Sequence, residues 1–259
     1  MKLAICEWVT PIKGPAIFPR LKSLGIDGIQ LDDWDAAAQN HPLTQSYVQR
    51  LYKDAAAQTG ISLIGVGACH GIPHYVHTYH ITKPLIVTDK GIVNTGILKI
   101  ITDILDGDNI PYSIYDKTVP NPTIANIEEG RALYLTAHAQ AIIAVGGGSV
   151  MDCAKVIGAR VVKPRQSVQR MRGLLRVLKR TPLLIAVPTT AGTGSETTLA
   201  AVITDPAARH KYPINDFALI PDYAVLDPEL TRGLPPMLTA TTGMDALTHA
   251  IEAYIGRST

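Results

Sequence analysis

The sequence predicts an α/β protein built around a parallel, doubly wound sheet. Short apolar runs typical of buried strands alternate along the chain with segments of helical periodicity, as expected of β-α-β units. Two of these runs lead directly into glycine-rich loops, and parallel sheets hold their ligands at that end of the strands. With 259 residues, 46% of them hydrophobic and 18% charged, the chain is long enough for one or two domains with a sizeable core.

Residues 1–69 carry one β-α-β-α-β pattern, starting at residue 2. The runs KLAICEW, DGIQLDDWD and ISLIGVGA are apolar, and two amphipathic stretches separate them. The expected elements, in order, are a strand over 2–8, a helix over 15–25, a strand over 27–35, a helix over 44–60 and a strand over 61–68. Three strands cannot close a barrel, so we expect a partial domain with open sheet edges.

Residues 70–235 repeat the alternation and form the main α/β domain. Apolar runs predict strands over 83–89, 112–119, 141–145 and 183–190, and helical patterns lie around 91–107, 124–138 and 150–160. From about Pro236 the apolar spacing becomes helical again. We therefore expect residues 236–259 to be the first helix of a helical domain.

Charge and cysteine content exclude several classes of function. The 24 Lys and Arg residues against 22 Asp and Glu give a formal net charge of +2, which does not favour nucleic acid or a membrane surface as the main partner. Cys6, Cys69 and Cys153 are widely spaced and form neither a disulfide framework nor a metal knuckle, so a cytoplasmic location is expected. The sequence contains no apolar run of about 18 residues and no signal-peptide pattern, which predicts neither secretion nor a membrane span.

The first glycine-rich loop follows the strand Ala141–Val145. Gly146, Gly147 and Gly148 are followed by Ser149, which opens the next helix. Glycines let the backbone approach a ligand closely, and a helix N-terminus offers unpaired N–H groups and a positive dipole end. The loop therefore suits a pyrophosphate. The alternative is a tight strand-to-helix turn without a ligand, since the spacing matches neither standard phosphate-binding motif.

A second glycine-bearing loop, PTTAGTGSE over 188–196, follows the strand LLIAV. The two loops end two strands of one predicted sheet, so we expect them to converge on one crevice. The hydroxyls that would supply donors there belong to Thr189, Thr190, Thr193 and Ser195.

Asp89 ends a third predicted strand, LIVTD. A carboxylate at this position can accept hydrogen bonds from ribose hydroxyls and repel a 2′-phosphate. The alternative for Asp89 is a helix cap.

Asp245 and His249 are spaced i and i+4, hence on one face of the predicted C-terminal helix. A carboxylate and an imidazole so placed could share a divalent cation. The alternative is a carboxylate in the first helical turn and a histidine in the core.

Two further clusters receive structural interpretations. Gly71 and Pro73 are expected to interrupt any helix through His70, His74, His77 and His80, so no metal site is predicted there. A basic run without acidic residues extends from residue 153 to 195. We interpret it as the solvated face of a helix over RMRGLLRVLKR, with a basic field near the cofactor phosphates, in preference to a nucleic-acid surface. Its cations are Lys163, Arg165, Arg170, Arg172, Arg176, Lys179 and Arg180.

Six motifs occur in a fixed order: LIVTDKG, VPNPT, AVGGGSVMDCAK, PTTAGTGSE, INDFALIPDYAVLDPEL and TGMDALTHAIEAY. Together they closely resemble the iron-containing, or group III, alcohol dehydrogenase family, which is related in fold to glycerol dehydrogenase and dehydroquinate synthase. The resemblance covers about residues 72–259. It implies a Rossmann-like first domain that binds NAD(P), an all-helical second domain, and a divalent metal in the cleft between them, Fe(II) or alternatively Zn(II).

The resemblance also implies roles for individual residues. Asp89 would meet the adenosine ribose, Asn121 would lie beside the cofactor, and Lys211 would contact its ribose. The pyrophosphate would bind to Gly147, Gly148 and Ser149. Asp152 would lie on the nicotinamide side, and the remaining cofactor contacts would come from Thr189, Thr190, Thr193 and Thr198. Asp245 and His249 would be the first two metal ligands, and no catalytic residue is assigned.

Residues 1–69 resemble, through their strand pattern and the phrase GIDGIQL, the start of a TIM-barrel sugar-phosphate isomerase or epimerase of the xylose-isomerase type. Glu7 and Asp33 would lie at strand ends of such a barrel. With about three of the eight strands that a barrel needs, no catalytic role is expected for either residue.

The function implied by the family is metal-dependent transfer of a hydride between a primary alcohol, or its aldehyde, and NAD. Asp89 predicts a preference for NAD over NADP. The family takes two further metal ligands from later histidines. With Asp245 and His249 as its two ligands, this chain is expected to hold metal weakly and to show little turnover. The alternative hypotheses for the function are a non-catalytic nucleotide-binding fragment and a fusion related to sugar isomerases. The expected partners are a small alcohol or aldehyde and a second copy of the chain, with neither nucleic acid nor membrane.

Overall fold

The computed structural model describes residues 4–6, 18–23, 28–31, 62–66, 69–227 and 229–256. The chain divides between Gly71 and Ile72 into two compact units, Met1–Gly71 and Ile72–Thr259. Each unit has its own parallel sheet.

The first unit contains three strands in the order β1-β2-β3. They pair in parallel, with Ala4 opposite Gly28 between β1 and β2, and with a register shift at Ile29/Gln30 between β2 and β3. The described elements are β1 (Ala4–Cys6), α1 (Phe18–Ser23), β2 (Gly28–Leu31), β3 (Ser62–Val66) and the 3-10 helix η4 (Cys69–Gly71). Strands are thus present where the sequence predicts them. The predicted helix over 44–60, Glu7 and Asp33 lie outside the described residues.

The second unit is built on a parallel sheet with the strand order β11-β8-β6-β4-β5. Its strands are β4 (Pro84–Val87), β5 (Ser113–Tyr115), β6 (Ala141–Gly146), β8 (Leu183–Pro188) and β11 (Tyr223–Ala224). The chain passes from β4 outward to β5 and then returns to β6 on the other side of β4. This reversal is the topological switch point at which doubly wound sheets bind ligands, and it confirms the predicted fold class.

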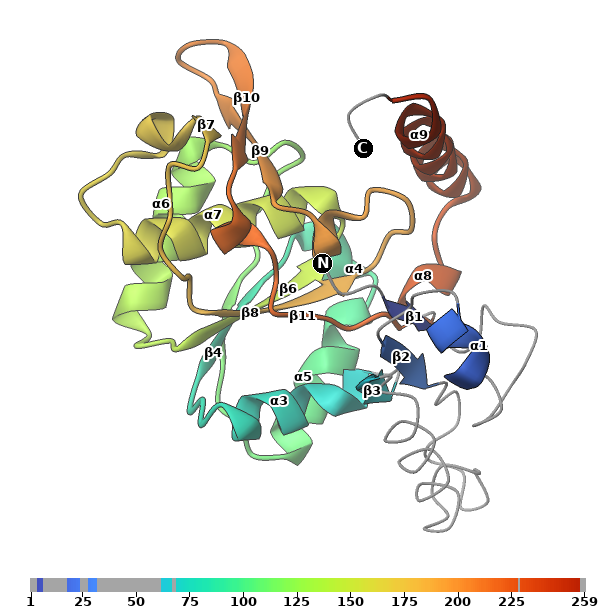
Figure 1. Ribbon diagram of the computed structural model, residues 1–259. Coiled ribbons are helices and arrows are strands. Elements are labelled where there is room, and N and C mark those ends of the chain that lie inside the picture. Colours follow the sequence, from blue (N-terminus) through green and yellow to red (C-terminus); the bar gives the residue numbers. More distant parts are fainter. Residues whose placement is uncertain are drawn as a thin grey trace. The chain divides into compact units, whose positions relative to one another are not determined.

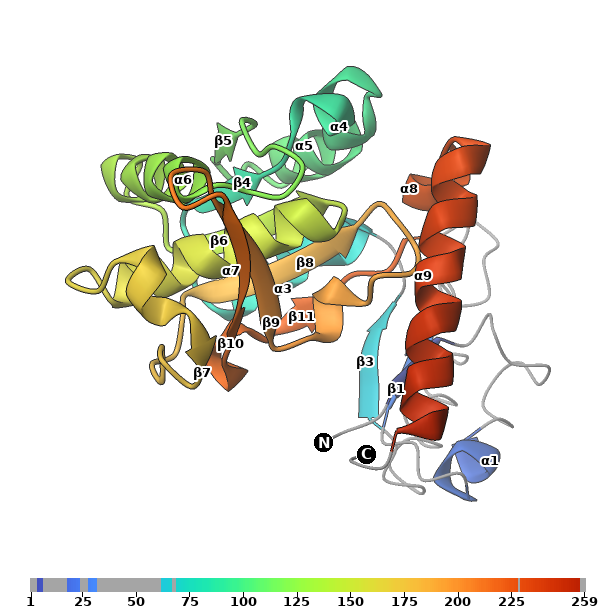
Figure 2. The same cartoon turned by 90° about the horizontal axis from the view of Figure 1, so that it is seen from above.

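Helices cover both faces of this sheet, with α6 and α7 on one face and α3 and α5 on the other (Figures 1 and 2). The helices are α3 (Ile72–Thr78), α4 (Lys90–Asn94), α5 (Ile97–Gly107), α6 (Ile124–Thr136), α7 (Gly148–Val162), α8 (Glu229–Arg232) and α9 (Pro236–Ile255). The helix predicted around 91–107 is divided in two, because Gly96 has a φ of 80° and starts a new helix at α5.

The core lies between the central strands and α7. Every residue of β6 and β8 is buried, as expected for parallel strands covered on both faces. The middle of α7 is buried on all sides and includes Cys153 and, more unusually, the charged Lys155.

A second, smaller sheet with the order β7-β10-β9 packs through β9 against α7. Its strands are β7 (Gly173–Leu174), β9 (Ala200–Asp205) and β10 (His210–Asn215), with β9 antiparallel to β10. The inward-facing Ala201, Ile203 and Ile214 are fully buried. The sequence interpretation did not include this sheet.

Two predictions about local structure are wrong. The segment RMRGLLRVLKR is not a helix: it contains the end of the 3-10 helix η5 (Val168–Met171) and then β7, and Leu175 and Leu178 have positive φ values of 51° and 47°. Pro73 does not interrupt α3, because it occupies the first turn, where proline costs no hydrogen bond. The break after Gly71 is present, however: α3 carries His74 and His77, while His70 lies in η4 and His80 follows the helix.

Candidate functional site

Three strands of the main sheet end side by side at its carboxyl edge: β4 at Val87, β6 at Gly146 and β8 at Pro188. The Thr88 hydroxyl donates to the carbonyl of Val145 at 2.8 Å, and the Thr189 N–H donates to the carbonyl of Gly146 at 3.0 Å. These bonds continue the sheet past its last ladder pairs. The three loops therefore leave the sheet at one place.

The two glycine-bearing loops adjoin at this edge, as the sequence predicts. A Cβ built on Gly147 would lie 3.3 Å from the side chain of Thr190, and one on Gly148 would lie 3.4 Å from that of Thr193. Helix α7 begins here, with Gly147 as its N-cap, and within the described residues no side chain caps it. The first N–H groups of a helix have no intrahelical acceptor. They thus remain available to an anionic ligand, which is the donor set a pyrophosphate needs.

Asn121, Ser149 and Lys211 come together beside the start of α7 from three separate parts of the chain. The Asn121 N–H donates to Ser149 Oγ at 3.2 Å, and Lys211 Nζ donates to Asn121 Oδ1 at 2.8 Å. Asn121 has a φ of 56°, a left-handed conformation that asparagine tolerates better than most residues. The lysine ammonium is thereby held close to the helix N-terminus.

Asp152 and Lys155 hold the segment that follows β8. The Asp152 carboxylate accepts from the Ser195 hydroxyl at 3.1 Å and from the Val202 N–H at 3.0 Å. Lys155 Nζ donates to the carbonyls of Thr198 and Ala200 at 2.8 and 2.9 Å. The second glycine-bearing loop is therefore fixed from inside the protein.

Burial changes the acidity of both groups. Desolvation raises the pKa of Asp152, although its bond with Val202 and the nearby Lys155 charge oppose this. Desolvation lowers the pKa of Lys155 to about 8, against the attraction of Asp152 and Glu196. The opposite charges of Asp152 and Lys155 each reduce the free-energy cost of burying the other.

Asp89 caps helix α4 by accepting a hydrogen bond from the Ile92 N–H at 3.0 Å. This is the alternative that the sequence left open. The cap does not remove Asp89 from the site, because the residue still lies at the carboxyl end of β4, next to the switch point.

Asp245 and His249 share one face of α9, with His249 Nε2 3.7 Å from Asp245 Oδ1. Their side chains are 47% and 65% exposed. No group of three or more His, Cys, Asp or Glu side chains that could hold a metal ion is present in the described part of the chain. One turn before Asp245, the Thr242 carbonyl closely approaches Gly192, where a Cβ would overlap it, so α9 passes beside the second loop.

The start of the basic run lies far from this edge, so for Lys163 the predicted place near the cofactor phosphates is wrong. Lys163 is the C-cap of α7, whereas the phosphate-suited loop is at its N-terminus. A helix of 15 residues separates the two by about 22 Å. Lys163 therefore cannot act on a ligand at Gly147. Arg172, in contrast, lies 5.7 Å from the ring centroid of Tyr212, the residue after Lys211.

Lys155 is the site residue that sequence reasoning missed. It is 1% exposed and donates to four oxygen atoms of the loop after β8. The signal was a lysine one turn after Asp152, in a helix that from Met151 onward is apolar except for Asp152, Lys155 and Arg160. The same inspection would have found Arg160, which is 7% exposed.

Fold and site together define a Rossmann-like α/β protein with an uncapped, glycine-rich helix start at its switch point. Residues 60–228 match the sequence model of the family described as iron-containing alcohol dehydrogenase. The chain belongs to this family.

Curated relatives include lactaldehyde reductase from Escherichia coli strain K12, 42% identical over 194 residues, which cover 74% of this chain and 51% of that protein. Alcohol dehydrogenase 4 from Saccharomyces cerevisiae is 39% identical over 195 residues, which cover 75% of this chain and 51% of that protein. Among solved structures, the alcohol dehydrogenase from Oenococcus oeni has a TM-score of 0.69 and 37% identity, covering 72% of this chain and 49% of that one. The sulfoacetaldehyde reductase from Bifidobacterium kashiwanohense, in complex with NAD+, has a TM-score of 0.64 and 32% identity, covering 72% and 49%. The chain thus spans about half the length of these relatives.

In the described part of the chain, no helix has both the length and the apolar character needed to cross a membrane.

Proposed function

We propose that this chain binds NAD at the carboxyl edge of its main sheet and serves in hydride transfer between a small alcohol, or its aldehyde, and that cofactor. The observation that carries the proposal is the meeting of two glycine-bearing loops at the uncapped N-terminus of α7. The family relationship and the NAD+ complex of a relative support it.

The residues present fit a dinucleotide. The N–H groups at Gly148 and Ser149 face the switch point and would bind the pyrophosphate, while Gly147 leaves room for its oxygens. The Lys211 ammonium, held by Asn121, would add a positive charge beside the ribose. Asp89 would accept from the adenosine ribose hydroxyls and disfavour a 2′-phosphate by like-charge repulsion.

The remaining predicted residues keep the site in shape. Thr189 is buried at the end of β8 and ties that strand to β6, whereas Thr190 and Thr193 present hydroxyls beside the helix start. Thr198 and Asp152 position the loop through their bonds with Lys155 and Ser195. When bound, the nicotinamide supplies the hydride chemistry, and the protein orients it and limits its access to water.

The metal proposal rests on fewer groups. Asp245 and His249 have the chemistry of Fe(II) ligands, and Zn(II) is the alternative. A catalytic site normally uses three or more protein ligands, and the described residues supply two near each other. We propose these two as part of an iron site and expect the chain alone to hold metal weakly. This ligand count also favours the second candidate function, nucleotide binding without turnover.

The decisive experiment is calorimetric titration of NAD and NADP into the wild type and into the Gly147→Val and Asp89→Gly variants. We expect NAD to bind the wild type, Gly147→Val to lose at least about tenfold in affinity, and Asp89→Gly to gain affinity for NADP. Gly107→Val is the matched control, because a side chain there meets open space. Equal NAD affinity in wild type and Gly147→Val would refute the pyrophosphate assignment.

A separate assay distinguishes the enzyme from the nucleotide-binding protein. NADH formation from several primary alcohols is measured under anaerobic conditions after addition of Fe(II). Turnover that Asp245→Asn and His249→Gln abolish, without changing NAD affinity, supports the enzyme. NAD binding without turnover supports the second candidate. A cytoplasmic location is proposed from the cysteine usage alone.

A further inference from the structure

Beyond the C-terminus of α7, the chain forms a cleft that the proposed function does not use. The cleft has a volume of about 860 Å³ and is open to solvent. Its lining contains five cations and, among the described residues, no carboxylate. These cations are Lys163, Arg165, Arg170, Arg176 and Lys179.

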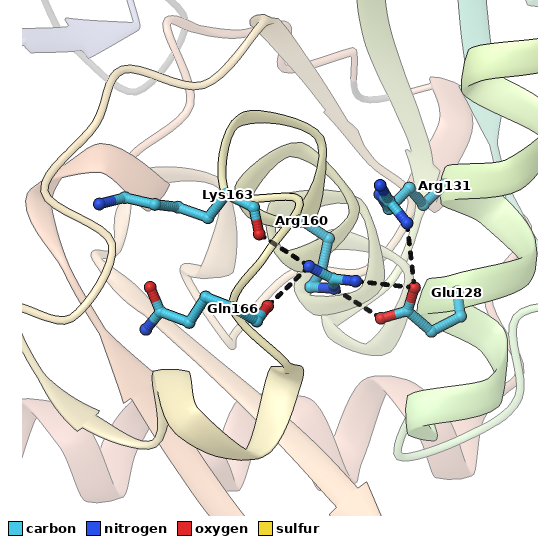
Figure 3. Close-up of polar contacts among 5 residues, drawn as sticks. All are labelled: Glu128, Arg131, Arg160, Lys163 and Gln166. Carbon is cyan, nitrogen blue, oxygen red and sulfur yellow. Dashed lines mark hydrogen bonds and ion pairs between the residues drawn. The ribbon is translucent and has the colours of Figure 1, made fainter.

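An ion pair between a buried arginine and a half-buried glutamate holds the base of this cleft in place. Arg160 is almost fully buried, and its Nε and Nη2 donate to the Glu128 carboxylate on α6 at 2.5 and 3.1 Å (Figure 3). Its Nη1 donates to the carbonyls of Lys163 and Gln166 at 2.7 and 2.6 Å. A cation thus binds two carbonyl groups just past the end of α7 and reduces the negative charge that this helix C-terminus presents.

Gln166 continues this network to the arginines of the cleft. Its side-chain amide donates to the carbonyls of Arg170 and Arg176, both at 3.2 Å, and so joins the two segments that supply most of the guanidinium groups. The cations are therefore carried on a backbone fixed by hydrogen bonds back to the buried Arg160.

The charges of the cleft have no carboxylate partners in the part of the chain that the structure describes. Within residues 69–227 and 229–256, none of its five cations forms an ion pair with a carboxylate, in contrast to Arg180, which lies 3.5 Å from Asp222. Cations gathered without carboxylates repel one another, and a multiply charged anion relieves that repulsion. Guanidinium groups in particular match phosphate oxygens in geometry.

We propose that this cleft binds a multiply charged phosphate compound of small-molecule size. Its volume lies within the range of small-molecule sites, about 300–1,000 Å³. Val162, Pro164 and Leu175 provide an apolar wall for an uncharged part of the ligand. The lining contains no aromatic side chain on which nucleic-acid bases could stack, which argues against single-stranded nucleic acid. A second copy of the chain is disfavoured, because a two-fold contact would bring cations against cations.

The test is calorimetric titration with inorganic tripolyphosphate. The cleft variant is Arg176→Gln with Lys179→Gln, and its matched control is Lys22→Gln with Lys99→Gln, which removes the same charge from exposed positions outside the cleft lining. We expect affinity to fall on the order of tenfold or more in the cleft variant and to change little in the control. Gln166→Leu, which leaves the net charge unchanged, should also weaken binding. Denaturant midpoints measured in parallel show whether each variant is folded.

Other outcomes overturn the proposal. Equal losses in the cleft variant and the control would mean that only net charge matters. Loss of tripolyphosphate binding in Gly147→Val but not in the cleft variant would place the anion at the nucleotide edge. Two further probes are a DNA duplex and phosphatidylcholine vesicles containing phosphatidylserine. If either binds more tightly than tripolyphosphate, with the same dependence on Arg176 and Lys179, the partner is a macromolecule or a membrane and the small-molecule assignment is wrong.

Discussion

Asp152 and Lys155 lie one turn apart on α7 and bind the same hydroxyl group. Lys155 Nζ donates to Ser195 Oγ at 3.4 Å, and that hydroxyl donates to Asp152 Oδ1 at 3.1 Å. Helix α7, which starts at the first glycine-bearing loop, therefore also fixes the second glycine-bearing loop over residues 188–196.

Protein stability should rise with pH because of Lys155. Its pKa is about 8 in the folded chain against 10.5 as the ordinary value, so between these pH values the unfolded state binds more protons. From about pH 7 to about pH 9.5 the free energy of unfolding should increase by about 2 kcal/mol more in the wild type than in Lys155→Met. Urea denaturation at the two pH values measures this difference. Parallel pH profiles in the two proteins would contradict it.

Replacing Asp152 by asparagine should loosen the loop after β8. The amide has one acceptor oxygen where the carboxylate has two, so it can accept from Ser195 or from Val202 but not from both. We expect a loss of about 1–3 kcal/mol in the free energy of unfolding. Asp103→Asn on the exposed face of α5 is the control and should cost less than about 1 kcal/mol. Similar losses at both positions would show that Asp152 does not hold the loop.

Adding a methyl group at Gly146 should disturb the start of α7. Its Cβ would lie 2.5 Å from Val150 Cγ2, so Gly146→Ala should cost about 1–3 kcal/mol and weaken NAD binding. Val150→Ala in the same chain removes the two methyl groups but keeps the Val150 Cβ at 2.8 Å, so it relieves the clash in part and the two losses should be less than additive. Gly107→Ala, which meets open space, should be close to neutral. Strict additivity in denaturant titrations would rule out the clash.

Replacing Arg160 by lysine should lower the free energy of unfolding. Arg160 spreads four hydrogen bonds over Glu128 and two carbonyls, and a single ammonium group cannot reach all of these acceptors. Arg160→Lys should cost about 1–3 kcal/mol. Arg131→Lys alters a 3.5 Å contact with the same carboxylate and should cost less than about 1 kcal/mol. Thermal denaturation of both variants provides the comparison, and a smaller loss at Arg160 than at Arg131 would be the opposite result.

The main sheet was predictable because its strands are buried on both faces. Runs such as Ala141–Val145 and Leu183–Val187 are then continuously apolar and are followed by a glycine or a proline. The smaller sheet was not recognised, since β9 and β10 are each exposed on one side and contain charged residues. In β9 the buried Ala201 and Ile203 alternate with more exposed residues, and in β10 the buried Tyr212 and Ile214 do the same. This period of two is the pattern from which both strands could have been predicted.

Leucines at helical spacing led to the wrong structure for residues 170–180. Periodicity reports which side chains would share a helix face, but it does not report the backbone strain at Leu175 and Leu178 or the pairing of Gly173 with Ile214. The same limit applies to the site. Glycine loops identify the edge from sequence, whereas the bonds from Lys155 to Thr198 and Ala200 join residues more than 40 positions apart.

The depth of Cys153 in α7 also determines its chemical reactivity. Burial raises the pKa of this thiol to about 12, so at neutral pH the nucleophilic thiolate is on the order of one part in 10⁵. Alkylating reagents and peroxide, which attack thiolates, therefore meet an inert group for as long as α7 stays packed between β6 and β9. The rate at which Cys153 becomes labelled consequently reports how often the core opens, and it provides a probe for that motion in the native sequence.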